Sequence, residues 1–328
     1  MKCTNKLCAI LMGAVLVFQA GCGSGVEELS RPYDIYETTA GVGLAASKNA
    51  EEKTFFSDGL CVADDVAIGT EDTDSYVAGG AAAFNVATGE VVYAKNLYTK
   101  LYPASTTKVL TAYIVLKYAA DLDETVTVSE NAADQEADSS VCGVKAGDRI
   151  TMRDLLYGLM LRSGNDAAIA IAEHMSGSVE AFAELMNQEA LNLGATQSHF
   201  VNPNGLPDEN HYTSVYDMYL LFNEAIKNEA FVQLISTKSY DTAYTDAEGN
   251  PVEHTWENTN QYLAGNQTAP EGFTVVGGKT GTTGDAGYCL VLYSYNAKGD
   301  PIISIVFKAD GRSNLYLLMN EILQGYAN

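Results

Sequence analysis

Residues 103–120 read PASTTKVLTAYIVLKYAA, and within them stands the chain's only Ser-x-x-Lys motif, Ser105 to Lys108. Apolar residues follow Ser105 at helical spacing, and Pro103 and Ser105 are typical of a helix start. We therefore predict a helix from Ser105 to Ala120, and because it is largely apolar we expect it to be buried. Residues three apart share one face of a helix, so the side chain of Lys108 should reach the Ser105 hydroxyl.

This pair of residues has the chemistry of a nucleophile and its base. A serine becomes nucleophilic when a base removes its proton, and a lysine buried beside it can have its pKa lowered enough to serve. A serine at a helix start also lies near free backbone N–H groups that can stabilise an oxyanion. Taken alone, the motif arises about once by chance in a chain of this length, and a helix cap with a solvated lysine is the alternative.

A second candidate is Ser163-Gly-Asn165, which follows the apolar run 155–161. A hydroxyl and an amide two residues apart can relay a proton and hold a substrate amide. The same pattern occurs at Ser129-Glu-Asn131, where we expect the serine to cap a helix instead. We choose Ser163 because an apolar helix before its turn can hold it rigidly.

A third candidate is Lys279-Thr280-Gly281-Thr282, between the β-prone segment 273–276 and a strand predicted at 288–295. A cation and hydroxyls beside an exposed strand edge can bind a carboxylate, and Gly281 permits a substrate backbone to approach closely. A P-loop is excluded, because Phe273 stands where that motif needs glycine and no helical pattern follows.

The rest of the chain predicts a sheet built from distant segments. A hairpin is expected over 76–94, with strands at 288–295 and 302–308. Helices are expected at 152–161, 166–175, 179–193, 214–228 and 313–324. Strands at both ends with helices between them imply a sheet covered by helices, with an all-helical insertion.

The N-terminal residues have the order of an export signal. Lys2 and Lys6 precede an apolar run over 7–18, so we predict a signal peptide at 1–21, because the run is too short for an ordinary spanning helix. The small residues before Cys22 resemble a bacterial lipobox, which would make Cys22 a lipidation site. Gln19 stands where Leu, Val or Ile is usual, so ordinary cleavage stays open.

Composition limits the remaining possibilities. After the signal we expect a flexible tether over 22–75 and a catalytic domain over 76–328. Removing Lys2 and Lys6 changes the formal net charge from −23 to −25, which argues against binding nucleic acid. Three cysteines remain beyond Cys22, without metal-ligand spacing: Cys61, Cys142 and Cys289. We expect buried thiols, and neither a metal nor a cofactor.

The three motifs in this order resemble the signature of penicillin-binding proteins and serine β-lactamases. The closer similarity is to low-molecular-mass D-Ala-D-Ala carboxypeptidases, from about Tyr76 to the C-terminus. It also covers His199–Leu206, His211–Thr213 and Asn258–Asn260. The resemblance implies an α/β fold of the penicillin-binding-protein and β-lactamase kind, an antiparallel sheet flanked by helices with a mainly helical inserted lobe.

The resemblance also implies roles for individual residues. Ser105 would be the acylated nucleophile and Lys108 its base, while Ser163 would pass a proton to the departing D-Ala. The oxyanion would lie between the backbone N–H groups of Ser105 and Thr282. The residues implied in substrate binding are Asn165, Lys279, Thr280, Gly281, Thr282 and Arg312, and for Arg312 a solvated arginine at a helix start is the alternative.

By the same resemblance, the enzyme would trim peptidoglycan stem peptides and be acylated by β-lactam antibiotics. It would act at the outer face of the cytoplasmic membrane or in the cell wall, anchored there if Cys22 carries a lipid. The family usually has His where Asn204 stands. We interpret Asn204 as a loop substitution away from the chemistry.

Two other functions compete with this interpretation. A class A β-lactamase would need a glutamate to activate water, but Glu189-Ala-Leu-Asn192 has a spacing one residue short, and we expect Glu189 on a helix surface. A non-catalytic sensor of β-lactams or peptidoglycan is disfavoured because all three motifs are intact. A Ser-His-Asp hydrolase is also disfavoured, because the chain has no Gly-x-Ser-x-Gly motif to partner its histidines. We therefore expect His199 and His211 to be structural.

Overall fold

The structure, a computed structural model, describes residues 57, 59–69 and 77–326. The predicted signal peptide and Cys22 lie outside these residues. Among the helices of the described part, none has both the length and the apolar character needed to span a membrane.

A five-stranded antiparallel sheet joins the two ends of the domain, in the order β2-β1-β9-β8-β7. Its strands are β1 (Gly80–Asn85), β2 (Glu90–Lys95), β7 (Thr274–Thr283), β8 (Gly287–Tyr295) and β9 (Pro301–Ala309). β1 pairs with β9, so that Ala82 lies opposite Ile305 although the two are far apart in sequence. The predicted sheet of distant segments is thus confirmed, and β7 forms one of its edges.

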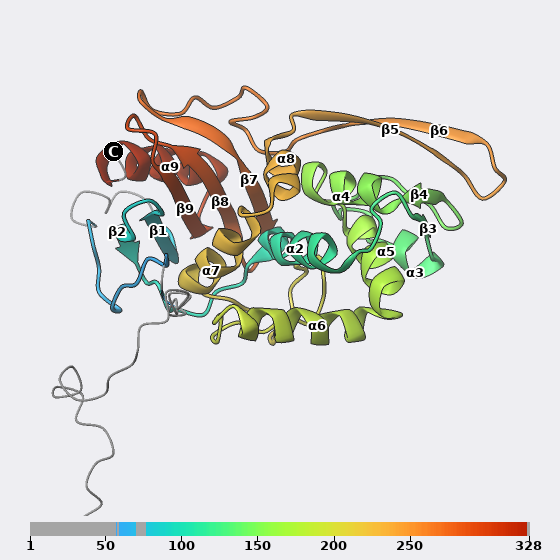
Figure 1. Cartoon of the computed structure of the whole chain (residues 1–328), viewed down its shortest axis with the longest axis horizontal. Helices are drawn as coiled ribbons and strands as arrows, with labels where there is room; N and C mark the ends of the chain where they lie inside the picture. The colour runs from blue at the N-terminus through green and yellow to red at the C-terminus, as the bar shows by residue number, and fades with distance from the viewer. Residues whose placement is uncertain (1–56, 58, 70–76, 327–328) are drawn as a thin grey trace, which may run out of the picture. The chain divides into compact units, whose positions relative to one another are not determined.

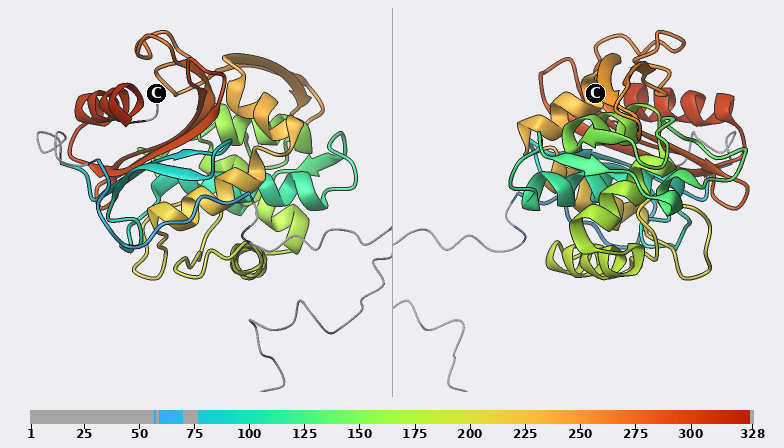
Figure 2. Two further views of the ribbon diagram at one scale, coloured as in Figure 1. Left: turned by 60° about the vertical axis from the view of Figure 1, so that its left-hand side comes forward. Right: turned by 90° about the vertical axis from the view of Figure 1, so that its right-hand side faces the viewer.

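Helices cover both faces of this sheet (Figures 1 and 2). α9 (Arg312–Tyr326) packs Met319 and Ile322 in one core with Ala81 and Val306. The other face belongs to a larger core that continues into the helical lobe. The remaining helices are the 3-10 turn η1 (Ala104–Thr107), α2 (Lys108–Tyr118), α3 (Glu130–Ala133), α4 (Met152–Leu161), α5 (Asn165–Ser176), α6 (Val179–Asn192), α7 (Val215–Ala225) and α8 (Glu229–Ser236).

Side-chain caps explain where several helices begin. Thr151, Ser178 and Ser214 each accept a hydrogen bond from the backbone N–H three residues later, which starts α4, α6 and α7. Ser129 caps α3 in the same way, as predicted. The helix expected from Ser105 to Ala120 instead starts with a 3-10 turn.

The lobe is not all-helical, and this expectation is wrong. A second sheet, in the order β3-β4-β5-β6, lies beside the helices. Its strands are β3 (Thr125–Thr127), β4 (Arg149–Thr151), β5 (Ser239–Thr245) and β6 (Pro251–Glu257). Two of them have only three residues, too few to show an alternating pattern. The β5–β6 hairpin is stabilised by aromatic stacking, with the rings of Tyr240 and Trp256 6.4 Å apart.

Residues 59–69 pack against the domain, which differs from the flexible tether expected over 22–75. The Cys61 thiol is buried, its backbone N–H donates to the Tyr219 hydroxyl at 2.8 Å, and Ile68 forms a bridge with Ala94. Cys61 is buried and Ile68 is partly buried against the core, so the packed domain begins before residue 76. The expectation of buried thiols is confirmed for Cys61, Cys142 and Cys289.

Candidate active site

Ser105 lies in η1, directly against the edge strand β7. A Cβ atom on Gly281 would lie 2.9 Å from the Ser105 backbone nitrogen and 3.0 Å from the Pro103 carbonyl oxygen. Only glycine permits this approach, so Gly281 allows Ser105 to lie at the edge of the sheet. Ala104, just before Ser105, has a left-handed backbone with φ +48°, a conformation that L-residues rarely adopt.

Lys108 is fully buried and donates three hydrogen bonds from its Nζ atom. The acceptors are Ser105 Oγ at 3.1 Å, Asn165 Oδ1 at 2.7 Å and the Asn204 carbonyl at 2.7 Å. Burial lowers the pKa of Lys108 well below its ordinary value, and the nearby charge of Lys279 lowers it further. In the neutral form, the amine donates only to Asn165 and Asn204, and its lone pair can accept the Ser105 proton. The alternative of a solvated lysine behind a capping serine is therefore wrong.

Ser163 and Lys279 form a second pair of the same kind. Lys279 Nζ donates to Ser163 Oγ at 3.0 Å, and only 1% of Lys279 is exposed. Burial lowers the pKa of Lys279 to about 7. Ser163 has φ +60°, which turns the chain between α4 and α5 and leaves the hydroxyl at the pocket wall.

Asn165 begins α5 and is fixed from both ends of its amide. Its Oδ1 accepts from Lys108, and its Nδ2 donates to Ser139 Oγ at 2.7 Å. The neighbouring Asp166 carboxylate accepts from the backbone N–H groups of residues 142, 143 and 144. The start of α5 is thereby tied to the loop that carries Ser139.

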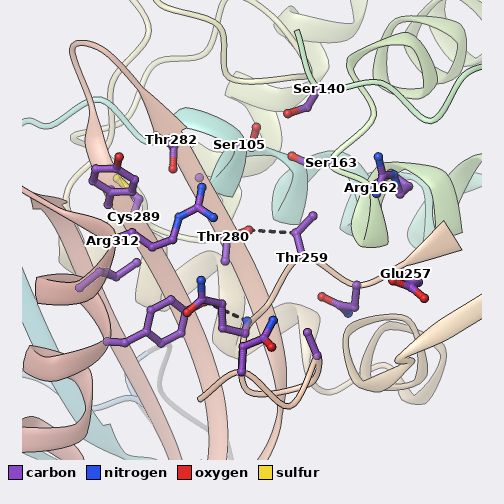
Figure 3. Close-up of a pocket in the computed structure, with 18 residues that line it drawn as sticks. Ser105, Ser140, Arg162, Ser163, Glu257, Thr259, Thr280, Thr282, Cys289 and Arg312 are labelled. Atoms are coloured by element: carbon purple, nitrogen blue, oxygen red, sulfur yellow. Dashed lines mark hydrogen bonds between the residues drawn. The ribbon is translucent and has the colours of Figure 1, made fainter. Parts of the chain in front are cut away.

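Both serines of these pairs open onto one pocket of about 410 Å³ (Figure 3), while the two lysines are buried behind them. Ser105 and Ser163 lie on one wall, while Thr280 and Thr282 come from β7. Arg312, the first residue of α9, also lines the pocket, and its guanidinium lies 6.0 Å from the Tyr288 ring centroid. Arg312 thus stands at a helix start and faces the pocket as well.

Comparison with known proteins now gives the family. The chain matches the family model described as D-alanyl-D-alanine carboxypeptidase over residues 68–311. The chain belongs to this family. It is 36% identical over 228 residues to D-alanyl-D-alanine carboxypeptidase DacF of Bacillus subtilis, covering 68% of this chain and 55% of that protein. It is also 36% identical to the D-alanyl-D-alanine carboxypeptidase of Streptomyces sp. strain K15, covering 65% of this chain and 75% of that protein.

Solved structures agree with this assignment. The crystal structure of the Streptomyces K15 DD-transpeptidase superposes with a TM-score of 0.70 at 32% identity, covering 75% of this chain and 95% of that one. The D-alanyl-D-alanine carboxypeptidase DacD of Francisella tularensis gives a TM-score of 0.67 at 27% identity, covering 80% of this chain and 73% of that one. The α/β fold predicted from the sequence, an antiparallel sheet flanked by helices, is confirmed.

The structure places further residues, which the three motifs do not contain, in the site of this member of the D-alanyl-D-alanine carboxypeptidase family. Ser139 holds Asn165, and Thr259 Oγ1 lies 3.1 Å from Thr280 Oγ1. Ser140 and Arg162 also line the pocket. Thr259 lies inside Asn258–Asn260, a segment similar to the carboxypeptidase family, so the sequence contains a signal for it. Nothing in the sequence indicates Ser139 or Ser140.

Asn204 was expected to lie away from the chemistry, and this is wrong. Its carbonyl accepts from Lys108 Nζ at 2.7 Å, and only 3% of the residue is exposed. Its side-chain Oδ1 accepts from the Leu206 backbone N–H at 3.0 Å. The side chain therefore shapes the loop whose backbone contacts Lys108.

Two further expectations concern residues outside the pocket. Glu189 was expected on a helix surface, but it is buried, because its carboxylate accepts hydrogen bonds from Lys117 and Tyr118. His211 is buried with Nε2 2.8 Å from Thr107 Oγ1, and burial lowers its pKa to about 4. A neutral, enclosed imidazole suits the structural role predicted for it.

Proposed function

We propose that this chain is a serine-type D-Ala-D-Ala carboxypeptidase that removes the terminal D-Ala of peptidoglycan stem peptides. The observation that carries the proposal is the convergence of two buried lysine–serine pairs on one pocket. Lys108 contacts Ser105 at 3.1 Å, and Lys279 contacts Ser163 at 3.0 Å. One pair suits attack on a carbonyl, and the other suits proton delivery to a leaving group beside a bound anion.

In the acylation step, Lys108 takes the Ser105 proton while Oγ attacks the carbonyl of the penultimate D-Ala. The backbone N–H groups of Ser105 and Thr282 stabilise the oxyanion, and the approach of Gly281 to Ser105 supports this pairing. The C–N bond then breaks, and Ser163 passes the proton held by Lys108 to the departing amine, which returns Lys108 to its neutral form. Water hydrolyses the ester in the second step, with Lys108 as base, and this restores Ser105.

Substrate binding follows from the same geometry. Lys279, Thr280 and Thr282 hold the terminal carboxylate, with Arg312 as a second cation at the pocket wall. A bound anion would favour the protonated form of Lys279, whose pKa burial has lowered to about 7. The peptide backbone would lie along the β7 edge, as in other strand-addition complexes, with Asn165 holding its amide.

The same proposal covers partners and location. The partners are peptidoglycan stem peptides and β-lactam antibiotics, and the net charge of −23 argues against nucleic acid. We propose export by the signal at 1–21 to the outer face of the cytoplasmic membrane or the cell wall. Lipidation at Cys22 would then anchor the chain, through a tether that ends before the packed segment 59–69.

The test is release of D-Ala from a pentapeptide, together with covalent labelling by a fluorescent penicillin. Ser105→Ala should abolish both, because the proposed acyl-enzyme forms on its hydroxyl. Ser129→Ala is the matched control: it removes a serine from the similar Ser-Glu-Asn sequence, where the side chain caps α3 and donates to Glu173. The control should keep both activities, and labelling that persisted in Ser105→Ala would show that another residue is the nucleophile.

The assay also separates the two competing functions. Rapid multiple-turnover hydrolysis of penicillin without D-Ala release would favour a β-lactamase. Labelling without turnover of either compound would favour a sensor.

A further inference from the structure

A second pocket, of about 220 Å³, meets the catalytic pocket at Ser105. It is lined by Ser139 and Asn165, the residues that orient Lys108, and by the loop that carries Asn204. Ser140 lines both pockets, and in Figure 3 it lies on the other side of Ser105 from Arg312. The nucleophile therefore stands where two pockets meet.

The two pockets differ in charge. Two cations, Arg162 and Arg312, and one carboxylate, Glu257, line the catalytic pocket, and the buried Lys279 contacts Ser163 at its wall. Among the described residues lining the second pocket none is a cation, and two are carboxylates, Glu136 and Asp138. Both side chains are exposed, and no ion pair of the described residues involves either.

The wall formed by the 202–207 loop of this second pocket is partly apolar. Leu206 and Pro207 line it, and 36% of Leu206 is exposed. A ligand that suits both walls has an aliphatic stem with a cation at its end. This is the shape of the side chain of a lysine or of another diamino acid.

The direction of the substrate connects this chemistry to the reaction, and the step rests on the proposed function. If the terminal carboxylate binds at Lys279 and Arg312, the acyl part of the peptide leaves Ser105 on the opposite side, toward the second pocket. The third residue of the stem peptide is the one before the penultimate D-Ala, so its Cα is only about 3.8 Å farther along the chain. Its side chain can therefore enter the second pocket.

We propose that Glu136 and Asp138 select stem peptides whose third residue carries a free side-chain ammonium. The methylene groups pack on Leu206, and the ammonium interacts with the two carboxylates. Acylation of that amine, as in a cross-linked stem peptide, removes the charge and adds bulk. The enzyme accordingly prefers uncross-linked stem peptides with a diamino acid at the third position.

The experiment compares two peptides that differ only in this charge, Nα-acetyl-Lys-D-Ala-D-Ala and its Nα,Nε-diacetyl form. In the wild type at low salt, kcat/KM for the free amine should be about fivefold higher, the size expected of exposed ion pairs. The ratio should fall toward one in Glu136→Gln/Asp138→Asn and in about 1 M salt. The control, Glu248→Gln/Glu253→Gln, removes two exposed carboxylates from the β5–β6 hairpin and should keep the fivefold ratio.

Equal kcat/KM values in the wild type would overturn the proposal, and so would a preference that survives in the double variant. Acylation rates with ampicillin and benzylpenicillin, which differ by one side-chain ammonium, give the same comparison without any hydrolysis. A wild type that prefers ampicillin but releases D-Ala from neither peptide would contradict the carboxypeptidase function and still support the cation pocket. Loss of the ampicillin preference in the double variant alone then confirms the two carboxylates as its source.

Discussion

Replacing Gly205 by alanine tests whether the 202–207 loop holds the base in place. Gly205 has φ +89°, and a Cβ atom there would lie 1.9 Å from the Ala104 carbonyl oxygen and 2.4 Å from its carbon. Neither backbone atom can move without displacing Ser105. The loop must therefore retreat from η1, and it takes with it the Asn204 carbonyl that accepts from Lys108.

The loss of folding free energy in Gly205→Ala follows from two separate costs, and the loss of rate follows from the displaced Lys108. An L-residue in the left-handed region costs about 1–2 kcal/mol of folding free energy. Loss of the hydrogen bond from Lys108 to Asn204 costs about 1 kcal/mol more, and a misplaced base slows acylation by about tenfold or more. Gly249→Ala is the matched control, because its φ is +85° and a Cβ atom there meets nothing within 4 Å.

We expect both variants to unfold at lower denaturant concentrations, but only Gly205→Ala to react slowly with fluorescent penicillin. Stopped-flow labelling and urea midpoints on the same preparations measure the two effects. Acylation of Gly205→Ala at the wild-type rate would refute the argument that this loop positions Lys108. Slow acylation of Gly249→Ala would equally show that the backbone cost, not the clash, is responsible.

Three further results are expected. Lys279→Ala should cost about 2–5 kcal/mol of transition-state stabilisation. Amidating the substrate C-terminus should reduce the activity of the wild type much more than that of this variant. Equal losses of activity in both would show that Lys279 does not bind the carboxylate. The pKa of Lys279 is about 7 in the folded state and about 10.4 unfolded, so between these values the unfolded state binds more protons and stability rises with pH. Lys279→Met should reduce that rise between pH 7.5 and 9 by about 1 kcal/mol per pH unit, measured by urea unfolding; identical slopes would contradict the lowered pKa. Penicillin should leave a long-lived adduct on Ser105, visible by intact mass, because its ring remains in the pocket and obstructs water, and rapid loss of the adduct would contradict this.

The motifs predict the site well because helical spacing fixes local geometry. Residues three apart at a helix start must share a face, so Ser105 and Lys108 are in contact as expected. The approach of Lys279 to Ser163 depends on how β7 lies against the turn between α4 and α5, which no local pattern determines. The family resemblance implied a separate role for each of the two residues, and their contact was not predicted.

The wrong predictions from the sequence also have physical causes. Asn204 accepts the Lys108 hydrogen bond through its backbone carbonyl, which every residue type has. The identity of the side chain at this position therefore does not indicate the contact. Glu189 is buried because Lys117 and Tyr118 approach from α2, a tertiary contact. β3 and β4 are each three residues long and become strands through pairing with each other and, for β4, with β5.

Two of the backbone conformations in the site limit how this protein can be engineered. Ala104 and Ser163 have φ values of +48° and +60°, and each such residue destabilises the folded state by about 1–3 kcal/mol. Glycine at either position would relieve that cost and raise the melting temperature. The same relief would let the Ser105 and Ser163 hydroxyls sample more orientations. A thermostability screen would therefore tend to select slower enzymes at these two positions, and faster variants should be sought elsewhere in the chain.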